Sequence, residues 1–405
     1  MKKRILFVDD EDLILQGLQR MLRPMRDEWE MEFLDGGAKA LGRMAVAHFD
    51  VVVSDMRMPG MNGAELLNRV MKQYPKTVRL ILSGHADKDL ILKCVGSTHQ
   101  FLSKPCEPES IRSTILRASA NENSLQNDTI KRLVGQMDRL PSIPSLYVEL
   151  VEALQDPEAS LETIGAIVEQ DIGMTAQILK LVNSAFFGLR RQISSPVEAA
   201  NYLGLDTLRS LVLSINAFSQ FDAVKIDGFS LAQLWTHSME TGAVAKAIAQ
   251  MEDADRKFAD EAFVAGLLHD TGKLVLAANF SEQYAQVVSL MQSDALDASK
   301  AEQRVFGATH ASVGGYLLGL WGLPVPVVEA IALHHEPARA PEKIFSPLTA
   351  VHAADALVHQ SAAPAGAAPD LGLDTDYLAA LGLASHTAVW REGLQNLNTV
   401  TPQAA

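Results

Sequence analysis

The sequence has few cysteines, no long apolar run and a deficit of positive charge, and each absence excludes a class of protein. Its two cysteines, Cys94 and Cys106, cannot form a disulfide framework, so we expect a reducing, cytoplasmic setting. No run of about 18 apolar residues is present, so no membrane insertion is expected. The start, MKKRILFVDDED, has only a short apolar run that acids interrupt, which does not fit a signal peptide.

Basic residues are fewer than acidic ones, 35 against 49, and the formal net charge is -14. Such a surface repels phosphate backbones and anionic lipids, so we expect no nucleic-acid partner and no general affinity for membranes. Hydrophobic residues make up 48% of the 405 residues, which excludes global disorder and favours two or three domains with cores of their own.

Residues 1–120 alternate short apolar stretches with amphipathic helical patterns. The apolar stretches are RILFVDD, MEFLDG, DVVVSD, VRLILSG and HQFLSKP, and patterns such as DLILQGLQRMLR and DKDLILKCV separate them. Because the stretches are continuously apolar, they predict a parallel sheet that is covered on both faces. The expected fold of this segment is α/β, a doubly wound five-stranded parallel sheet.

Polar residues follow these predicted strands. Asp9 and Asp10 end the first, Asp55 the third and Ser83 the fourth, and Lys104 comes after the fifth. The carboxyl ends of parallel strands meet at one edge of a sheet, so these side chains are expected to converge. Three neighbouring carboxylates need a cation, and hard oxygen ligands suit Mg²⁺. The set therefore predicts a site that binds magnesium and holds a phosphoryl group on one carboxylate.

The motifs VDDE, SDMRMPGMNG, LSG and FLSKP make this segment similar to the response-regulator receiver domains, which have a flavodoxin-like fold. The resemblance implies that a sensor histidine kinase phosphorylates Asp55. It also implies that Ser83 and Lys104 contact the phosphoryl oxygens and that Phe101 is the aromatic switch residue. The implied Mg²⁺ ligands are Asp9, Asp10, Asp55 and the main-chain carbonyl of Arg57.

A helical linker is predicted over residues 121–140, where NENSLQNDTIKRLVGQMDRL has apolar residues at three- and four-residue steps. It would continue the last helix of the first domain, with a break near Asn121–Asn123. Either it forms a short coiled-coil seam in a homodimer or it packs on the second domain. Two heptads are too few to decide between these alternatives.

From Pro141 onward helical patterns dominate, which predicts an all-α domain over residues 141–360. SSPVEAANYLG is a well-formed helix unit, with Ser195 as N-cap, Pro196 in the first turn and Gly204 as terminator. Residues 361–376, SAAPAGAAPDLGLDTD, read as a loop. The remainder of 361–405 is predicted to be a helical extension with a frayed tail.

Histidines and aspartates recur in apolar helical surroundings of this second half. A lone histidine there is more often a hydrogen-bonded core residue than a ligand, but a set of this size favours a metal site. Adjacent residues diverge around a helix, so His269 and Asp270 of GLLHDTGKL can both reach a metal only at a helix edge. Imidazole with carboxylate suits Zn²⁺, Fe or Mn²⁺. The candidate ligands are His237, His269, Asp270, His310, His334, His335 and Asp355.

Over about residues 138–360 the chain resembles the HD superfamily of metal-dependent phosphohydrolases, and more closely its HDOD branch, the HD-related output domains. The motifs are LPSIP, LKLVNSAFFG, AANYLG, GLLHDTGKLVL, THASVGGYLL and WGLPVPVVEAIALHHEP. The candidate ligands follow the ligand order of the cyclic-di-GMP-hydrolysing HD-GYP relatives, and Lys273 matches their lysine. After HHE, however, the chain reads PARAPEK and has no Gly-Tyr-Pro, which argues against a cyclic dinucleotide substrate.

Three functions remain open at this point. In the first, phosphorylation of Asp55 shifts the switch face of the receiver, and the helical domain changes its contacts with a downstream protein partner. In the second, the receiver gates a metal-dependent phosphohydrolase or phosphodiesterase in which Lys273 steadies developing charge. A weaker third alternative is a metal that serves as a structural or redox sensor. The missing Gly-Tyr-Pro and the output-domain motifs favour the first function.

Overall fold

The computed structural model describes residues 2–392 apart from 84–96, 121–124, 126, scattered positions between 138 and 158, 184–191, 205–207, 209–218, 221–225, 295 and 363–371. Cys94, the predicted helix over DKDLILKCV and most of the predicted loop over 361–376 lie outside the described residues. The chain forms two compact units. The first comprises Met1–Glu169, Ala176–Gln220 and Tyr316–Leu323, and the second comprises Gln170–Thr175, Phe221–Gly315 and Pro324–Ala405.

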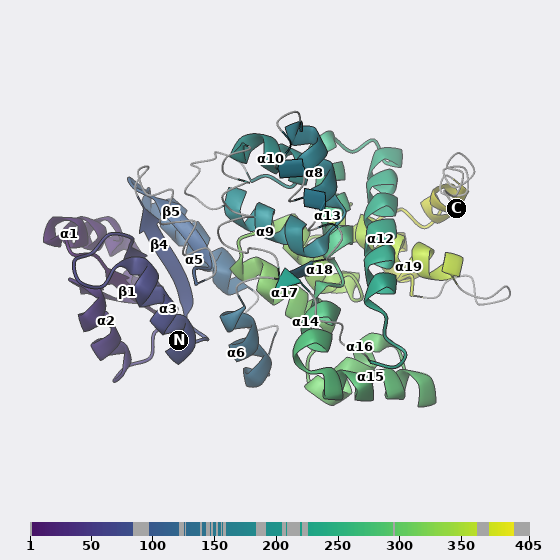
Figure 1. Ribbon diagram of the computed structural model, residues 1–405. Coiled ribbons are helices and arrows are strands. Elements are labelled where there is room, and N and C mark those ends of the chain that lie inside the picture. The colour runs from purple at the N-terminus through teal and green to yellow at the C-terminus, as the bar shows by residue number, and fades with distance from the viewer. Residues whose placement is uncertain are drawn as a thin grey trace. The chain divides into compact units, whose positions relative to one another are not determined.

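A parallel sheet of five strands lies in the first unit, in the order β2-β1-β3-β4-β5 (Figure 1). Phe7 in the first strand lies opposite Phe33 on one side and Val53 on the other. The residues Val51, Val52 and Val53 are completely buried, as expected where helices cover both faces of a sheet. The predicted doubly wound α/β fold is therefore confirmed. The strands are β1 (Lys3–Val8), β2 (Trp29–Leu34), β3 (Val51–Asp55), β4 (Val78–Ser83) and β5 (Gln100–Ser103).

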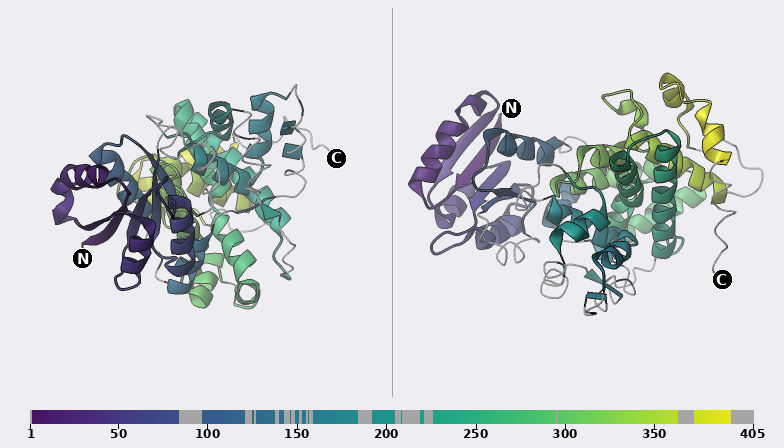
Figure 2. Two further views of the ribbon diagram at one scale, coloured as in Figure 1. Left: turned by 60° about the vertical axis from the view of Figure 1, so that its left-hand side comes forward. Right: turned by 90° about the horizontal axis from the view of Figure 1, so that it is seen from above.

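Helices surround this sheet (Figures 1 and 2). The described ones are α1 (Asp12–Met21), η1 (Arg23–Asp27), α2 (Gly37–Met44), α3 (Gly63–Gln73) and α5 (Pro108–Ala120). Helix α3 begins after Asn62, whose side-chain oxygen accepts a hydrogen bond from the Glu65 N–H at 2.9 Å. A Cβ on Gly63 would lie 2.1 Å from the main-chain oxygen of Asp55, so only glycine lets α3 start beside that residue.

Helix α6 (Asp128–Gln136) contains most of the described residues of the predicted linker and packs against α3. Its residues Ile130 and Val134 are buried, and a Cβ on Gly135 would lie 2.0 Å from the carbonyl oxygen of Pro75. The side chain of Arg79, fully buried on β4, donates to the Gly135 carbonyl at 2.7 Å. The linker helix thus contacts the sheet domain, an arrangement that neither of the two sequence-based alternatives included.

The helices described between the linker and β7 (Ser219–Gln220) are α8 (Leu161–Glu169), α9 (Ile172–Val182) and α10 (Pro196–Leu203). The predicted caps of α10 are confirmed, since Ser195 Oγ accepts from the Glu198 N–H at 3.3 Å and Gly204 ends the helix with φ 75°. Two short strands, β6 (Pro141–Ser142) and β7 (Ser219–Gln220), pair in parallel. Sequence analysis predicted helices alone here, because strands of two residues are too short to show a periodicity.

The second unit is helical, and α12, α13, α18 and α19 pack against one another in it (Figure 1). Among the described residues, no helix is both long and apolar enough to cross a bilayer. The remaining helices are α12 (Leu231–Met251), α13 (Arg256–Leu268), α14 (Thr271–Asn279), α15 (Ser281–Ser293), α16 (Ala298–Phe306), α17 (His310–Leu320), α18 (Val325–Leu333), η3 (Pro337–Arg339), α19 (Pro347–Ala362) and α20 (Thr375–Ala380).

Candidate functional site

An acidic pocket, formed by Asp9, Asp55 and Lys104, lies at the carboxyl ends of β1, β3 and β5. The ammonium of Lys104 is 2.7 Å from Asp9 Oδ2 and also pairs with Asp55 Oδ1. The second oxygen of Asp55 accepts a hydrogen bond from the Arg57 N–H at 2.6 Å. The two carboxylates thus lie side by side, and one lysine holds them together.

Burial raises the pKa of Asp55, and Lys104 offsets this effect only in part. Burial lowers the pKa of Lys104, but the carboxylates of Asp55 and Asp9 more than reverse that effect and raise it. Both carboxylates are largely buried, with Asp9 1% and Asp55 8% exposed. A single lysine for two such carboxylates leaves the pocket with net negative charge, which suits a divalent cation with oxygen ligands.

The other residues predicted for this site lie on the same strands or beside them. Asp10 follows β1 and is exposed, whereas Phe101 on β5 is buried. Ser83 ends β4 opposite Ser103, but its side chain lies outside the described part of the structure. The roles of these residues, and of the Arg57 carbonyl as a ligand, stay predictions.

A histidine cluster forms the polar centre of the second unit. It comprises His237, His269, His310, His334 and His335 with the carboxylates Asp270 and Asp355, so every predicted ligand is in it. Helix α12 contributes His237, α17 begins with His310, and α19 contributes Asp355. His334 and His335 directly follow α18. Sequence analysis placed His269 and Asp270 on the edge of one helix, but they lie at the break between α13 and α14, where the backbone can aim both inward.

Hydrogen bonds fix the proton position on three of these imidazoles. His269 Nδ1 lies 2.6 Å from the Gly266 carbonyl, and His334 Nδ1 lies 2.8 Å from the Ile331 carbonyl. His310 Nδ1 lies 2.6 Å from a carboxylate oxygen of Glu302. A carbonyl or carboxylate oxygen can only accept, so each Nδ1 carries the proton. In a neutral ring, Nε2 is then an unprotonated electron-pair donor.

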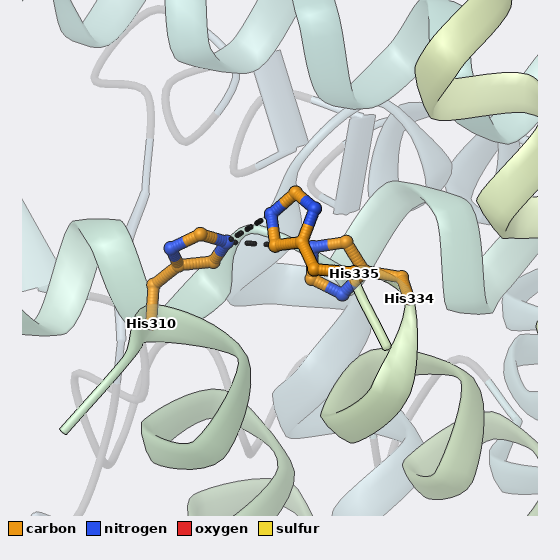
Figure 3. Close-up of side chains that lie close together, drawn as sticks. All are labelled: His310, His334 and His335. Atoms are coloured by element: carbon orange, nitrogen blue, oxygen red, sulfur yellow. Dashed lines mark hydrogen bonds between the residues drawn. The ribbon is translucent and has the colours of Figure 1, made fainter. Parts of the chain in front are cut away.

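The Nε2 atoms of neighbouring rings in the cluster lie close together. The Nε2 atoms of His310 and His334 are 3.3 Å apart, and His335 Nε2 is 3.0 Å from His310 Nε2 (Figure 3). Burial lowers the pKa of His334 well below its usual value and that of His335 to about 3, with neighbouring histidines adding to the effect. Nε2 of His334 is therefore an unprotonated donor that faces Nε2 of His310. A cation shared by the two rings would bind both nitrogens.

The two carboxylates complete the cluster. Asp270 directs Oδ1 to His310 Nε2 at 3.3 Å and Oδ2 to His269 Nε2 at 3.4 Å. Asp355 Oδ1 is 3.0 Å from His237 Nε2. Within the described residues, the buried Oδ1 of Asp270 accepts no hydrogen bond. Burial opposes ionisation of Asp270 and Asp355, yet the surrounding imidazoles, joined at Asp270 by Lys273, hold the pKa of each well below its usual value.

The ligand atoms fall into two groups that could each hold a cation. One is His237, His269 and Asp355, and the other is His310, His334 and His335, with the ligand atoms of each group within 4.8 Å of one another. A further group consists of His269, Asp270 and His334. It shares His269 with the first group and His334 with the second. Nitrogen and oxygen donors of this kind suit Zn²⁺, Fe or Mn²⁺. The ammonium of Lys273 pairs with Asp270 Oδ2 at 2.7 Å.

Sequence analysis missed two residues that touch this cluster. His359 lies one helical turn after Asp355, with Nδ1 2.9 Å from Asp355 Oδ1 and its ring against that of His237. That spacing was visible in the sequence. Glu302, the acceptor for His310, stands in an amphipathic helix with no feature that marks it out, so its role emerges only in three dimensions.

Comparison with known proteins gives two matches to family models along the chain. Residues 5–116 match the response regulator receiver domain, and residues 140–337 match the HDOD domain. An uncharacterized protein of Treponema pallidum is 28% identical over 239 residues, which are 58% of this chain and 46% of that protein. The hydrogenase transcriptional regulatory protein HoxA of Cupriavidus necator is 29% identical over 126 residues, 31% of this chain and 25% of HoxA. The chain thus matches less than half the length of these curated relatives.

Among solved structures, the MmoQ response regulator from Methylococcus capsulatus aligns over 62% of this chain and 98% of its own, with 22% identity and a TM-score of 0.49.

Proposed function

We propose that phosphorylation of Asp55 controls the output domain of this chain. The chain belongs to the response regulators that combine a receiver domain with an HDOD output domain. The donor is a sensor histidine kinase, and the controlled event is binding of a downstream protein partner or formation of a homodimer. The observation that carries this proposal is the acidic pocket. There Asp55 is held next to Asp9 by one lysine, with Arg57 N–H on its other oxygen.

The pocket residues have distinct tasks in phosphotransfer. An oxygen of Asp55 attacks the phosphorus as the bond to the donor nitrogen breaks, and the added oxygens bring new negative charge into the pocket. Lys104 is positioned to pair with that charge, which weakens its hold on Asp9 and Asp55. Asp9 and Asp10 would hold Mg²⁺, which supplies compensating positive charge when bound.

A contact within the first unit supports a route from this pocket to the output domain. Gln100, next to Phe101 on β5, donates to the main-chain carbonyls of Gly319 at 3.4 Å and Leu320 at 3.2 Å. These carbonyls end α17, the helix that begins with His310. A shift of β5 on phosphorylation would therefore act on the end of a helix that contributes a cluster residue.

Treatment of the full chain with acetyl phosphate tests this proposal, with Asp55→Asn as the matched control. We expect a Mg²⁺-dependent phosphoryl label on the wild type alone. A change in size-exclusion profile or in co-purifying proteins should accompany it. Labelling of the Asn variant, or no labelling of the wild type with magnesium and either acetyl phosphate or the cognate kinase, contradicts the proposal.

A second candidate function rests on the histidine cluster, where the Nε2 atoms of His310 and His334 face each other at 3.3 Å in a buried site. We propose that the cluster holds two divalent cations, one in each of the two groups, with Asp270 directed to both. Such cations would supply Lewis acidity for phosphoester hydrolysis. Lys273 would then neutralise charge that develops beside Asp270. The absence of Gly-Tyr-Pro after His335 leaves the substrate class open beyond a phosphoester.

Metal analysis of the purified chain separates the two functions. Stoichiometric metal that is lost in His269→Ala supports the cluster as a metal centre. Hydrolysis of a generic phosphodiester that disappears in Asp270→Ala would make the protein an enzyme. Metal without turnover leaves the output domain as a metal-stabilised interaction module, and a metal-free wild type contradicts the metal centre itself.

A further inference from the structure

Glu302 on α16 is a carboxylate that is completely buried, at 0% exposure, without contributing an oxygen to either group of ligands. Its Oε2 accepts from the main-chain N–H of His310 at 2.7 Å and from Nδ1 of the same residue at 2.6 Å. The hydroxyl of Tyr284 is 3.5 Å from its Oε1. Removing a carboxylate from water is costly, so a charge in this position needs compensation from its surroundings.

The two proposed cation positions differ in the charge that faces them. The group of His237, His269 and Asp355 contains a carboxylate, whereas the group of His310, His334 and His335 consists of imidazoles alone. The latter three residues are called the three-histidine position below. Of their rings, His334 donates its Nδ1 proton to a neutral carbonyl, and His310 donates to the carboxylate of Glu302. Asp270 Oδ1, 3.3 Å from His310 Nε2, lies at the edge of the three-histidine position. A buried dication there would find a second negative charge one ring away, through His310.

We propose that Glu302 is a positioning residue that supplies this negative charge and makes His310 the strongest nitrogen donor of the three-histidine position. The inference rests on the proposed metal centre. Hydrogen bonding to a carboxylate fixes the tautomer of a ligating imidazole, orients the ring and increases the electron density on the other nitrogen. The buried cation and the buried carboxylate of Glu302 carry opposite charges, so each lowers the cost of burying the other.

A purely structural role for Glu302 predicts a different outcome. The bond from the His310 N–H places a carboxylate at the first residue of α17, where it satisfies an otherwise free donor at a helix start. That task needs an acceptor oxygen but no negative charge at His310 Nε2. The variant Glu302→Gln keeps an acceptor of the same shape and removes the charge, so it separates the two roles.

The experiment measures metal binding by the full chain, without any enzyme assay. Metal-free wild type, Glu302→Gln and Glu302→Ala are titrated with Co²⁺ in competition with a chelator, and the visible absorption bands report the ligand field. Glu261→Gln serves as a matched control because Glu261 is another buried glutamate, 6% exposed, whose carboxylate pairs with Lys257 on its own helix. Thermal unfolding of each metal-free variant is followed in parallel.

We expect both positions to fill in the wild type and in Glu261→Gln. In Glu302→Gln one position should weaken by about 10-fold or more, with a shift of its Co²⁺ bands, while the other keeps its affinity. Wild-type affinity at both positions in Glu302→Gln would overturn the inference and leave the metal centre intact. If the wild type itself binds no metal, the metal centre fails and the inference with it. Should Glu302→Ala not fold, the Gln variant still decides the outcome.

Discussion

The acidic pocket around Asp55 and the histidine cluster around Asp270 share three components but differ in their ligands. In each site a buried aspartate pairs with a lysine, Lys104 in the pocket and Lys273 in the cluster. In each, a glycine lets two backbone segments meet, with Gly63 against the Asp55 carbonyl and Gly272 against the His310 carbonyl. The pocket then offers carboxylate oxygens, whereas the cluster adds five imidazoles.

This difference in ligands implies different lifetimes for the charge that each site holds. Oxygen ligands bind Mg²⁺, which keeps several of its waters, so the pocket suits a transient phosphoryl group and a readily exchanged cation. Imidazoles whose protons are fixed on Nδ1 favour a transition metal that stays bound. Under the two proposed functions, the chain would combine a site for a reversible signal with a site for a retained ion.

The variant Asp270→Asn gives the strongest test of the contrast between the two sites, because Asp270 directs one oxygen toward each group of histidines. We expect divalent-metal affinity of the cluster to fall by more than about 100-fold, a larger loss than is typical for a residue that acts through a ligand. Measurement is by metal content after dialysis against a chelator.

Asp55→Asn is the reciprocal control for that variant. It should retain the metal of the cluster and lose the phosphoryl label, whereas Asp270→Asn should retain the label. Equal metal content in Asp270→Asn and wild type would contradict the assignment of Asp270 as a shared ligand.

A smaller effect is expected from the two glycines. In Gly272→Ala the new Cβ would lie 1.9 Å from the His310 carbonyl oxygen, and in Gly63→Ala it would lie 2.1 Å from that of Asp55. Since main-chain atoms must move, each change should lower the free energy of unfolding by about 3 kcal/mol. Urea titration gives this value, and Gly272→Ala should also reduce metal binding while Gly63→Ala reduces phosphorylation.

The matched controls for these changes are Gly17→Ala in α1 and Gly42→Ala in α2, where a Cβ meets nothing within 4 Å. Alanine has a higher helix propensity than glycine, so each control should be neutral or more stable by up to about 1 kcal/mol. A Gly272→Ala protein as stable as its control would mean that α14 and α17 do not approach as closely as described.

The smallest effect concerns His99, a buried histidine outside the cluster. Burial lowers its pKa well below the usual value, and the positive charges of Arg79 and Lys180 lower it further. In the unfolded chain the pKa of this residue is about 6.5, whereas in the folded protein it stays neutral at that pH. The unfolded state therefore binds more protons, and stability falls as the pH drops below about 6.5.

His99→Gln should flatten this dependence by up to about 1.4 kcal/mol per pH unit, as judged by urea unfolding of the metal-free protein between pH 5 and about 7. The control is His48→Gln, since the side chain of His48 is 68% exposed. An identical slope in wild type and His99→Gln would show that His99 is protonated in the folded state too.

Much of both sites could be predicted, because their residues follow regular elements of recognisable pattern. The apolar run of Val51–Val53 identified a strand, and Asp55 directly after it had to lie at the sheet edge. The residues predicted from GLLHDTGKL and the later histidines do lie together in the cluster, although the break between His269 and Asp270 was not foreseen. The pattern could not predict that break, since apolar residues continue on both sides of it.

The packing of α6 and the role of Glu302 were out of reach for the opposite reason. The pattern of an amphipathic helix predicts an apolar face but not the surface that covers it. Ile130 and Val134 were therefore compatible with packing on a second copy of the chain, on the helical domain or on the sheet domain. Glu302 precedes His310 by eight residues, and only the turn between α16 and α17 brings the carboxylate against the imidazole.

By itself the sequence determined the parallel sheet, the polar residues at its edge and the set of residues that could bind metal, because these follow from periodicity and side-chain chemistry within short segments. The tertiary structure alone decided which nitrogens face one another, which carboxylate lies behind His310 and which surface α6 covers. Those outcomes depend on how helices distant in sequence approach, and at that range shape and burial rather than local preference select the contacts.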